Sequence, residues 1–349
     1  MKIVNVMISK KLGGIEQAFL DYTQALLLKN HEVILVTDKK NKLKEQIEKL
    51  PIAEKIMIKF THYNWFLVPI LYLKLKKFAP DVVIVHNKKA VPIFKTVSRL
   101  LGAKIIGVSH NPKFKKIDAC DAIFTITEYQ KNIFALKYPA DRIFTIPNMI
   151  TQKLDFMPRK KFQNPPQIRT MGRFDPMKGF PDFIKALAIL KNKKIAFKAV
   201  IGGKKQKDYP EEFEKITDLI KQNNLQDDVE LCGWVKDKDD FFAKADIFVL
   251  PSVFEPFGIV VLEAMQHSLP LVVSSAEGPA EIFAGHANCA KIFEIGNCEQ
   301  LADCLKELLS DFKTAQKMAK NGYDLCEKEY SLRKVAGKLN QALKEVVDE

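Results

Sequence analysis

The sequence has no apolar run long enough to cross a membrane. Its uninterrupted apolar stretches all fall short of the roughly 18 residues that a spanning helix needs. Residues 1–8 are typical of a first strand and lack the pattern of a signal peptide. We therefore expect a cytoplasmic protein.

Cysteine is sparse, and its six positions are scattered: Cys120, Cys232, Cys289, Cys298, Cys304 and Cys326. They form no Cys-x-x-Cys pair and no Cys/His cluster with the spacing of a zinc site. We expect reduced thiols in the core or at the surface, with no structural role as disulfides.

Acidic residues are few in the first half of the chain. Residues 1–150 contain 25 Lys and Arg against 12 Asp and Glu, whereas residues 151–349 contain 30 of each kind. All of the positive excess therefore lies in the first half. Two interpretations are open: a solvated Lys-rich surface, or attraction to an anionic membrane or an anionic acceptor.

An aromatic and aliphatic segment, residues 60–77, lies within this basic half, and three of its last four residues are lysine. Such a segment suits a membrane interface. A crossover helix packed on the core before a strand at 82–85 would have a similar pattern, so both interpretations stay open. A second basic cluster follows at Lys113, Lys115 and Lys116.

Short apolar runs rich in β-branched residues alternate with longer helical stretches, which predicts parallel sheets joined by crossover helices. The length suits two domains, with a Pro-rich and Lys-rich linker at 155–166 between them. Strands are expected near 2–8, 32–37, 82–86, 104–109, 122–126 and 143–146, then near 167–172, 196–201, 228–232, 246–250 and 270–273. Helices are expected between them, for example at 179–191, 211–223 and 297–309.

Two carboxylates, Glu255 and Glu263, stand eight positions apart across a predicted strand-to-helix turn. A buried strand at 246–250 precedes them, and Gly258 begins the helix. The first N–H groups of that helix lack intrahelical partners and, with the helix dipole, favour a phosphate or diphosphate. We predict that Phe257, Gly258 and Ile259 bind the diphosphate. Glu255, in the loop before this site, could hydrogen-bond a hydroxylated group attached to the distal phosphate, and Glu263 would face a different part of the ligand. One carboxylate then suits the sugar, and the other suits the ribose.

Two cations, Arg173 and Lys178, follow the predicted strand at 167–172. Arg can fork onto phosphate oxygens and Lys supplies a point charge, so the pair would neutralise a diphosphate without a metal. Gly13 and Gly14 would let the backbone approach a phosphate or sugar closely. In doubly wound domains these loops lie at the carboxyl ends of the strands, where ligands bind.

Two histidines each follow an apolar strand in the first half, His86 after 82–85 and His110 after 105–109. Their positions place both side chains at the mouth of the ligand cleft, although a histidine at the end of a strand is more often structural. Position in a loop is the only support for His86.

These motifs resemble those of retaining GT-B glycosyltransferases with an E-x7-E signature, namely glycosyltransferase family 4 or "glycosyl transferases group 1". The group includes bacterial lipopolysaccharide and phosphatidylinositol sugar transferases. Residues 255–263 carry the signature, and the other matches follow the family order. Those matches are residues 12–16 (Gly-Gly loop), 146–150 (Pro-Asn-Gly segment, with Met149 where Gly is usual), 170–179 (Gly-Arg…Lys-Gly motif) and 277–282 (Gly-x-x-Glu segment).

The resemblance implies an α/β protein of GT-B fold, in which two Rossmann-like doubly wound domains face one another across a deep cleft. The N-terminal domain, 1–154, would bind the acceptor and be joined by a C-terminal helix within 331–349. The C-terminal domain, 167–330, would bind the nucleotide sugar.

The resemblance also assigns roles to residues. A histidine at the position of His110 contacts the transferred sugar in the family, so the predicted catalytic residues are His110, Arg173, Lys178 and Glu255. Glu16 is placed at the site by resemblance alone. Glu281 matches a family acid, although a role as a helix N-cap is nearly as good an interpretation.

The implied reaction breaks the bond between the anomeric carbon and a diphosphate while an acceptor hydroxyl attacks from the same face. Fixed cations and helix N–H groups stabilise the charge on the leaving phosphate, which accepts the proton. Paired carboxylates also occur in glycosidases, but a hydrolase needs no cationic cradle for a diphosphate. No Asp-x-Asp motif stands in a suitable place, so we expect no metal and no cofactor.

We therefore predict a hexosyltransferase that uses a UDP-sugar or GDP-sugar and a glycan or lipid-linked acceptor, in lipopolysaccharide or other cell-surface polysaccharide synthesis. Peripheral contact with an anionic inner membrane through the basic first domain is part of this prediction. Two other classes stay open, a nucleotide-sugar 2-epimerase of similar fold and a non-enzymatic polyanion-binding protein. The sequence has no recognised nucleic-acid motif, so we expect no nucleic-acid partner.

Overall fold

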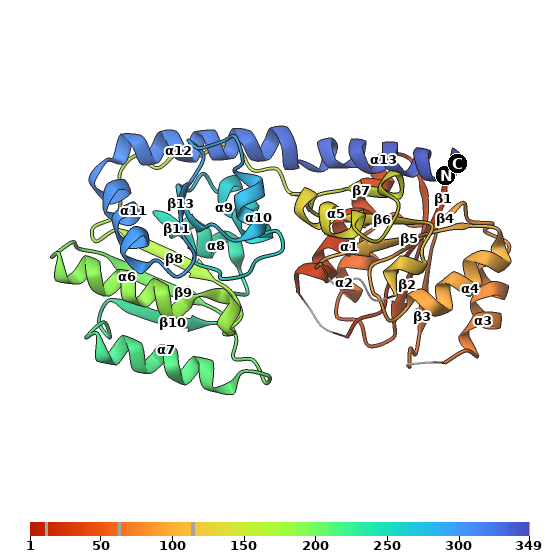
Figure 1. Ribbon diagram of the computed structural model, residues 1–349, viewed down its shortest axis with the longest axis horizontal. Coiled ribbons are helices and arrows are strands. Elements are labelled where there is room, and N and C mark those ends of the chain that lie inside the picture. Colours follow the sequence, from red (N-terminus) through yellow and green to blue (C-terminus); the bar gives the residue numbers. More distant parts are fainter. Residues whose placement is uncertain (11–12, 62–63, 113–115, 349) are drawn as a thin grey trace. The chain divides into compact units, whose positions relative to one another are not determined.

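A computed structural model describes residues 1–10, 13–61, 64–112 and 116–348. The chain divides into two compact units. Unit 1 comprises Met1–Gln152 with Glu329–Glu349, and unit 2 comprises Lys153–Lys328. Each unit is built around one parallel sheet, as the alternation of apolar runs and helical stretches predicts (Figure 1).

Unit 1 contains a seven-stranded parallel sheet. Its strands are β1 (Lys2–Met7), β2 (Glu32–Asp38), β3 (Glu54–Ile58), β4 (Val82–Val85), β5 (Lys104–Ser109), β6 (Ala122–Thr125) and β7 (Ile143–Thr145). The order across the sheet is β3-β2-β1-β4-β5-β6-β7, so it reverses between β1 and β4. Ligands of open α/β sheets bind beyond the carboxyl ends of the strands at such a reversal.

Helices cover both faces of this sheet. They are α1 (Gly14–Leu28), α2 (Lys44–Glu48), α3 (Leu67–Leu75), α4 (Val91–Leu101), α5 (Glu128–Ala135) and α13 (Leu332–Asp348), with short 3₁₀ turns η1 (Ile117–Ala119) and η2 (Ala140–Arg142). Side chains alternate along each strand, so neighbouring residues of β1 serve different cores. Ile3 packs in the cluster formed with α1 and α13, whereas Val4 packs in the cluster formed with α3 and α4.

The C-terminal helix α13 belongs to unit 1. The Ile150 N–H donates to the Tyr330 carbonyl at 2.9 Å, and the Leu332 N–H donates to the Ile150 carbonyl at 2.9 Å. Further along α13, Leu339 and Leu343 are buried in the same cluster as α1.

The net positive charge lies in unit 1. Residues 329–349 contain four basic and four acidic residues, so unit 1 carries the whole excess of +13.

Unit 2 repeats the architecture with a six-stranded parallel sheet of order β10-β9-β8-β11-β12-β13. Its strands are β8 (Gln167–Met171), β9 (Lys198–Gly202), β10 (Val229–Gly233), β11 (Ile247–Leu250), β12 (Leu271–Ser274) and β13 (Lys291–Phe293). Its helices are η3 (Pro176–Lys178), α6 (Phe180–Asn192), α7 (Pro210–Gln222), α8 (Lys238–Ala243), α9 (Ile259–Gln266), α10 (Glu277–Ile282), α11 (Cys298–Ser310), α12 (Phe312–Leu325) and the π turn η4 (Cys326–Tyr330). The order reverses between β8 and β11.

The segment expected to be a linker, residues 155–166, has no helix or strand but is fixed along unit 2. The Met157 N–H donates to Ser268 Oγ at 3.0 Å, and the Gln163 N–H donates to Asp246 Oδ2 at 3.1 Å. The Arg159 guanidinium donates to the Phe242 carbonyl at 3.1 Å.

All six cysteines are free, and burial raises the pKa of the Cys120 thiol to about 12. Among the described residues, no helix combines the length and the apolar composition needed to cross a bilayer.

Candidate active site

The loop after β8 carries the two cations, Arg173 and Lys178, that are predicted to bind phosphate. Asp175 is buried, and its carboxylate accepts from the Met177 N–H at 3.1 Å, which caps η3. The same carboxylate lies 3.2 Å from Arg173 Nε, while the Arg173 side chain is 65% exposed. The guanidinium is thus held at its Nε edge and reaches solvent, where it can contact an anion.

Gly179 fixes this loop against the neighbouring strand. Its φ of 63° lies in the left-handed region, and a Cβ at this position would lie 1.8 Å from the Pro251 carbonyl oxygen at the end of β11. The Val253 N–H donates to the Met177 carbonyl at 2.9 Å. The loop that follows β8 and the loop that follows β11 are therefore in direct backbone contact.

This contact brings two predicted catalytic residues together. Lys178 Nζ lies 2.7 Å from Glu255 Oε2, and the two side chains are only 18% and 13% exposed. The aliphatic stem of Lys178 lies against Gly172, where a Cβ would be 3.2 Å from Lys178 Cγ and Cδ. Sequence reasoning gave Lys178 to the phosphate and Glu255 to the sugar, and it did not predict that they pair across 77 positions of the chain.

The start of α9 follows the predicted pattern of turn and helix. Gly258 adopts φ 96° and ψ 54° as the N-cap, and α9 begins at Ile259. Phe257 is buried beside it. The helix therefore directs its N-terminal end, with its positive partial charge, at the same end of the sheet as the Lys178–Glu255 pair.

Glu263 lies on the second turn of α9 and is paired with a residue that the sequence did not single out. Lys238 Nζ, at the start of α8, lies 2.5 Å from Glu263 Oε1. The Glu263 carbonyl is also 2.8 Å from His267 Nδ1. Lysine is so common in this sequence that no local signal distinguishes Lys238 from its neighbours.

The segment that begins α10 closes on the Glu255 loop. The Gly278 N–H donates to the Glu255 carbonyl at 2.9 Å, and a Cβ at Gly278 would lie 2.4 Å from Phe257 Cα. Two oxygens in this region, Ser252 Oγ and Glu277 Oε2, are inaccessible to solvent and have no hydrogen-bond partner among the described residues. Buried polar atoms without partners are rare in folded proteins, and these two lie just after a strand and at a helix start.

The Gly-Gly loop of unit 1 leads into α1. Gly13 is extended at φ −179° and is the N-cap of α1, and Gly14 is the first residue of that helix. Glu16 is buried and accepts from Ser9 Oγ at 2.5 Å, and a Cβ at Gly13 would lie 3.3 Å from Glu16 Oε2. Because Gly13 has no side chain, the Glu16 carboxylate fits beside it. Leu12 at the start of this motif lies outside the described residues.

His110 follows β5 and is hydrogen-bonded to His86, which follows β4. His86 Nδ1 and His110 Nε2 are 3.2 Å apart, and the rings stack with centroids 5.4 Å apart. The expectation that His86 lies at a cleft mouth is wrong, because its side chain is only 3% exposed and packs edge-on against Tyr22 and Phe19. His86 thus supports the His110 ring from the interior of unit 1.

Both imidazoles are neutral at pH 7. Burial, with the neighbouring His110, holds the pKa of His86 well below its ordinary value. Burial, with the nearby Lys88 ammonium, lowers the pKa of His110 to about 4. A neutral His110 can exchange a hydrogen bond with a sugar hydroxyl, but it supplies no positive charge.

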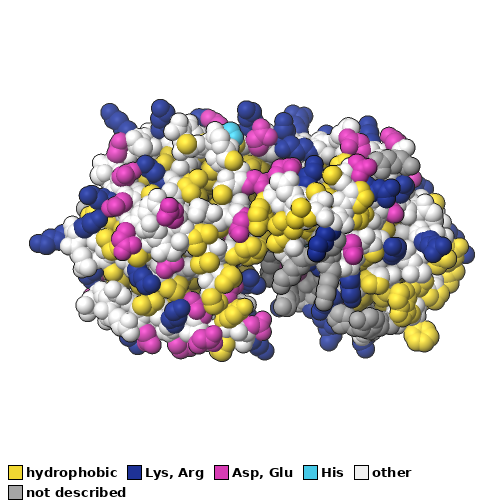
Figure 2. Space-filling view, viewed as in Figure 1, with side chains coloured by type: hydrophobic (Ala, Val, Ile, Leu, Met, Phe, Trp, Pro, Cys, Tyr) yellow, Lys and Arg dark blue, Asp and Glu magenta, His cyan; other side chains and the backbone are white. Residues whose placement is uncertain are grey.

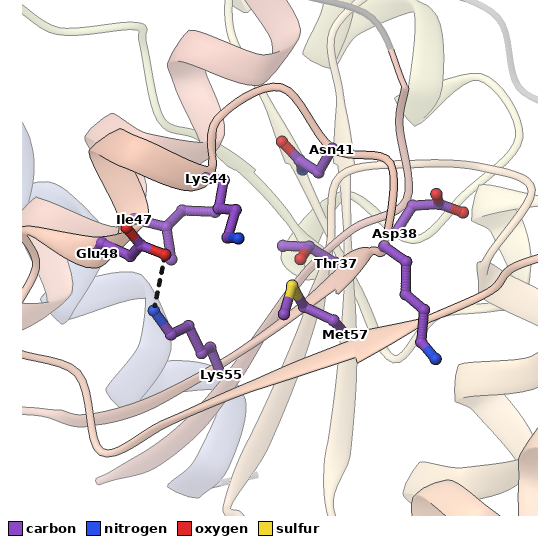
Figure 3. Close-up of a pocket in the computed structure, with 9 residues that line it drawn as sticks. Thr37, Asp38, Asn41, Lys44, Ile47, Glu48, Lys55 and Met57 are labelled. Atoms are coloured by element: carbon purple, nitrogen blue, oxygen red, sulfur yellow. Dashed lines mark ion pairs between the residues drawn. The ribbon is translucent and has the colours of Figure 1, made fainter.

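A pocket in unit 1 lies between β2, α2 and β3 and contains none of the predicted site residues (Figure 3). Three of its charged side chains are engaged within the chain. Asp38 accepts from the Lys40 and Phe60 N–H groups at 2.8 and 3.2 Å, and Lys55 pairs with Glu48 at 3.7 Å.

Lys113 and Lys115 of the second basic cluster lie outside the described residues. No group of His, Cys, Asp and Glu suited to a metal ion occurs among the residues that the structure does describe.

Two doubly wound parallel-sheet units define a GT-B architecture, and unit 2 carries a site of paired charges at a helix start. Residues 152–325 match the family model described as Glycosyl transferases group 1, and residues 12–153 match the one described as Glycosyltransferase Family 4. The chain belongs to this family of transferase enzymes, as its sequence motifs predicted.

Relatives of known sequence match parts of the chain. The lipopolysaccharide core biosynthesis glycosyltransferase LpsE of Rhizobium meliloti (strain 1021) is 28% identical over 176 residues, which is 50% of this chain and 49% of LpsE. The chain thus spans about half the length of that curated relative.

Solved structures share the fold over the whole chain. A glycosyltransferase from Rickettsia africae ESF-5 has a TM-score of 0.86 at 18% identity, with 100% of this chain and 99% of that chain covered. Anabaena HepE in complex with UDP-glucose has a TM-score of 0.82 at 18% identity, with 99% of each chain covered.

Proposed function

We propose that the protein is a retaining hexosyltransferase that needs no metal or cofactor and moves a sugar from a nucleoside-diphosphate sugar to a hydroxyl of a glycan or lipid-linked acceptor. The observation that carries this proposal is the Lys178–Glu255 pair, which sits on two backbone-linked loops and combines a cation with a carboxylate. A ligand with adjacent phosphate and hydroxyl groups suits both partners.

Unit 2 is the proposed donor site. Arg173 and Lys178 would share the diphosphate, with the N–H groups at the start of α9, at Phe257, Gly258 and Ile259. Glu255 would accept a hydroxyl of the sugar. Glu263, held by Lys238, would accept the ribose hydroxyls. The complex of HepE with UDP-glucose supports uridine as the first nucleotide to test.

In the proposed reaction the acceptor oxygen forms a bond to the anomeric carbon while the bond from that carbon to the diphosphate breaks. The departing phosphate oxygen takes the acceptor proton, so the step needs no external base. Negative charge grows on the diphosphate in the transition state, where Arg173 and Lys178 stabilise it. Because the acceptor attacks on the face that the phosphate leaves, the anomeric configuration is retained.

Unit 1 is the proposed acceptor side. The neutral His110, held by His86, would hydrogen-bond the transferred sugar. The Gly13–Gly14 turn follows β1 and so lies at the same carboxyl end of the parallel sheet. The name of LpsE supports a role in lipopolysaccharide or other cell-surface polysaccharide synthesis. A cytoplasmic location is a further part of the proposal.

Calorimetry with UDP, GDP and ADP sugars, in buffer with EDTA, tests this proposal. We expect one preferred nucleotide sugar, bound at least about tenfold more weakly by Glu255→Gln and by Lys178→Ala. Lys185→Ala is the matched control, because Lys185 pairs with Asp182 on α6 at 3.7 Å and is exposed. Failure of all nucleotides to bind at millimolar concentration would reject the donor site.

A product assay separates transfer from isomerisation. A transferase releases its nucleotide and depends on an acceptor for rapid turnover, whereas a 2-epimerase converts the sugar with no acceptor present. NMR of the preferred donor incubated with the enzyme alone distinguishes these outcomes. Appearance of a C2 epimer would replace the transferase proposal.

A further inference from the structure

The outer faces of α3 and α4 form an apolar surface that the proposed transfer reaction does not use. Helix α3 crosses from β3 to β4 and buries Leu71 and Leu75 in the core against α4. Its opposite face is left to solvent. The exposed apolar side chains of this α3–α4 surface are Trp65 (49%), Phe66 (84%), Ile70 (47%), Leu73 (58%) and Leu100 (56%).

The spacing of these residues explains their position on one face. Phe66, Ile70 and Leu73 recur at intervals of four and three residues, which places them in a row along a helix. Hydrophobic side chains gather at the edge of the molecule where Figure 1 places α3 and α4 (Figure 2). Single exposed apolar residues are ordinary, but this row, with the exposed Trp65 beside it, marks an interaction surface.

Positive charge surrounds this row. Residues 55–117 contain 13 Lys and Arg but a single acid, Asp81. Five of these cations lie on or directly after the two helices and are exposed: Lys74, Lys76, Lys77, Lys95 and Arg99. The salt bridges within the described residues use none of these five. Their charge is therefore available to an external anion.

We propose that the α3–α4 surface docks onto an anionic lipid bilayer. The aromatic and aliphatic side chains would enter the interfacial region, and the lysines would lie at the level of the lipid phosphates. A bilayer supplies apolar depth and negative charge together, without a shaped counterpart. A second copy of the chain would bring an equally basic surface, and the like charges would repel.

This inference rests on unit 1 and does not depend on the proposed transfer. It uses no residue of the candidate active site, so membrane docking and sugar transfer can each fail alone. Docking would nevertheless suit a lipid-linked acceptor, because it would hold unit 1 at the surface where such an acceptor lies.

Vesicle sedimentation tests the docking surface. The full chain is mixed with vesicles of phosphatidylcholine alone or of phosphatidylcholine with phosphatidylglycerol. We expect sedimentation with the anionic vesicles only, and a partition coefficient lowered about tenfold or more in Phe66→Ser/Leu73→Ser. Leu136→Ser is the control, because Leu136 is an 81% exposed apolar residue of the same unit outside this surface. It should bind as the wild type does.

A second comparison separates the surface from the net charge. Lys74→Gln/Lys76→Gln/Lys77→Gln and Lys39→Gln/Lys40→Gln/Lys42→Gln each remove three positive charges from unit 1. Only the first variant should lose binding. Equal loss in both would overturn the assignment in favour of bulk charge, and absence of wild-type sedimentation would overturn docking itself.

Two further measurements check the folding of unit 2 and the oligomeric state of the chain. Nucleotide-sugar binding by calorimetry should be unchanged in every variant, which reports a folded unit 2 independently of the membrane. Light scattering of the wild type without vesicles should give the mass of one chain. If the wild type is instead a dimer that does not bind vesicles, and Phe66→Ser/Leu73→Ser dissociates that dimer, the surface would be assigned to a second copy of the chain.

Discussion

At the residue scale, the pairing of Lys178 with Glu255 determines what each offers to a ligand. Both side chains are largely buried, so removing either one would leave the other as an unpaired buried group and would lower the stability of the fold. The carboxylate holds the Lys178 ammonium in place, and the lysine stem lies against Gly172. A phosphate oxygen that approaches the ammonium then joins an ordered pair and need not order a flexible side chain, which lowers the entropy cost of binding.

Replacing Lys178 with Ala should therefore lower turnover more than it lowers stability. We expect the initial rate of nucleotide release from the preferred donor to fall about 10²- to 10³-fold, because charge on the leaving phosphate loses its stabilisation. The free energy of unfolding should fall by about 1–3 kcal/mol, since Glu255 loses its partner. Lys185→Ala should keep both quantities near wild type. A similar loss of rate in Lys185→Ala would show that the assay responds to charge on α6 in general.

The histidine pair predicts a pH dependence of stability. The pKa of His110 is about 4 in the folded chain against an ordinary 6.5, so the unfolded state binds more protons between these values. The stability that depends on neutral His110 is complete above pH 6.5 and is lost as pH falls toward 4. His110→Gln removes this titration. Its urea midpoint should fall less than that of the wild type across this interval, and equal falls would contradict the assigned pKa.

At the element scale, the turn between η3 and α6 determines whether the two charged loops meet. Gly179 and Gly233 both have positive φ, at 63° and 74°, but only Gly179 of these two lies against other backbone. At Gly233 a Cβ would have no heavy atom within 4 Å. Substitutions at the two glycines can therefore distinguish the cost of backbone strain from the cost of steric overlap.

Gly179→Ala should destabilise the protein by at least about 3 kcal/mol, because a methyl group would overlap the Pro251 carbonyl as well as strain the backbone. Gly233→Ala should cost about 1–2 kcal/mol, from the left-handed backbone alone. Urea unfolding measures both values. Gly179→Ala should also weaken nucleotide-sugar binding, because the loop must move away from Pro251 to relieve the overlap, and this movement separates Lys178 from Glu255. Equal destabilisation by the two variants would mean that the loop moves freely away from Pro251.

Most elements could be predicted from the sequence because parallel strands are continuous apolar runs. The run at 246–250 and the helix at 179–191 correspond to β11 and α6 within a residue or two. The edge strands β3 and β13 were missed. Only two of the five residues of β3 are buried, and β13 has three residues, so neither carries a clear pattern.

The candidate site could be predicted less fully than the fold. Local motifs placed Arg173, Lys178 and Glu255 at strand ends, because turn and helix-start signals are short in range. The partnership of Lys178 with Glu255, and that of Glu263 with Lys238, depends on how separate loops pack. The segment 60–77 contains the crossover helix α3, one face of which joins the core while the other is exposed. Contact of that exposed face with a membrane stays a prediction.

At the scale of the whole molecule, the C-terminal helix makes unit 1 discontinuous in sequence. Its stability then depends on residues that follow unit 2 along the chain. Leu343 is fully buried in the cluster shared with α1, so Leu343→Ala should destabilise unit 1 by about 2–5 kcal/mol. Lys344→Ala, at the next and exposed position of α13, should change stability by less than about 0.5 kcal/mol.

The two tryptophans allow this prediction to be read for each unit, because Trp65 lies in unit 1 and Trp234 in unit 2. In a Trp234→Phe background, fluorescence during urea unfolding reports unit 1, and Leu343→Ala should shift that transition. In a Trp65→Phe background it reports unit 2, and the same substitution should leave the transition in place. Each unit has its own sheet and its own core clusters, so the two can unfold separately. Equal shifts of both transitions would instead show that α13 couples the units into one cooperative structure.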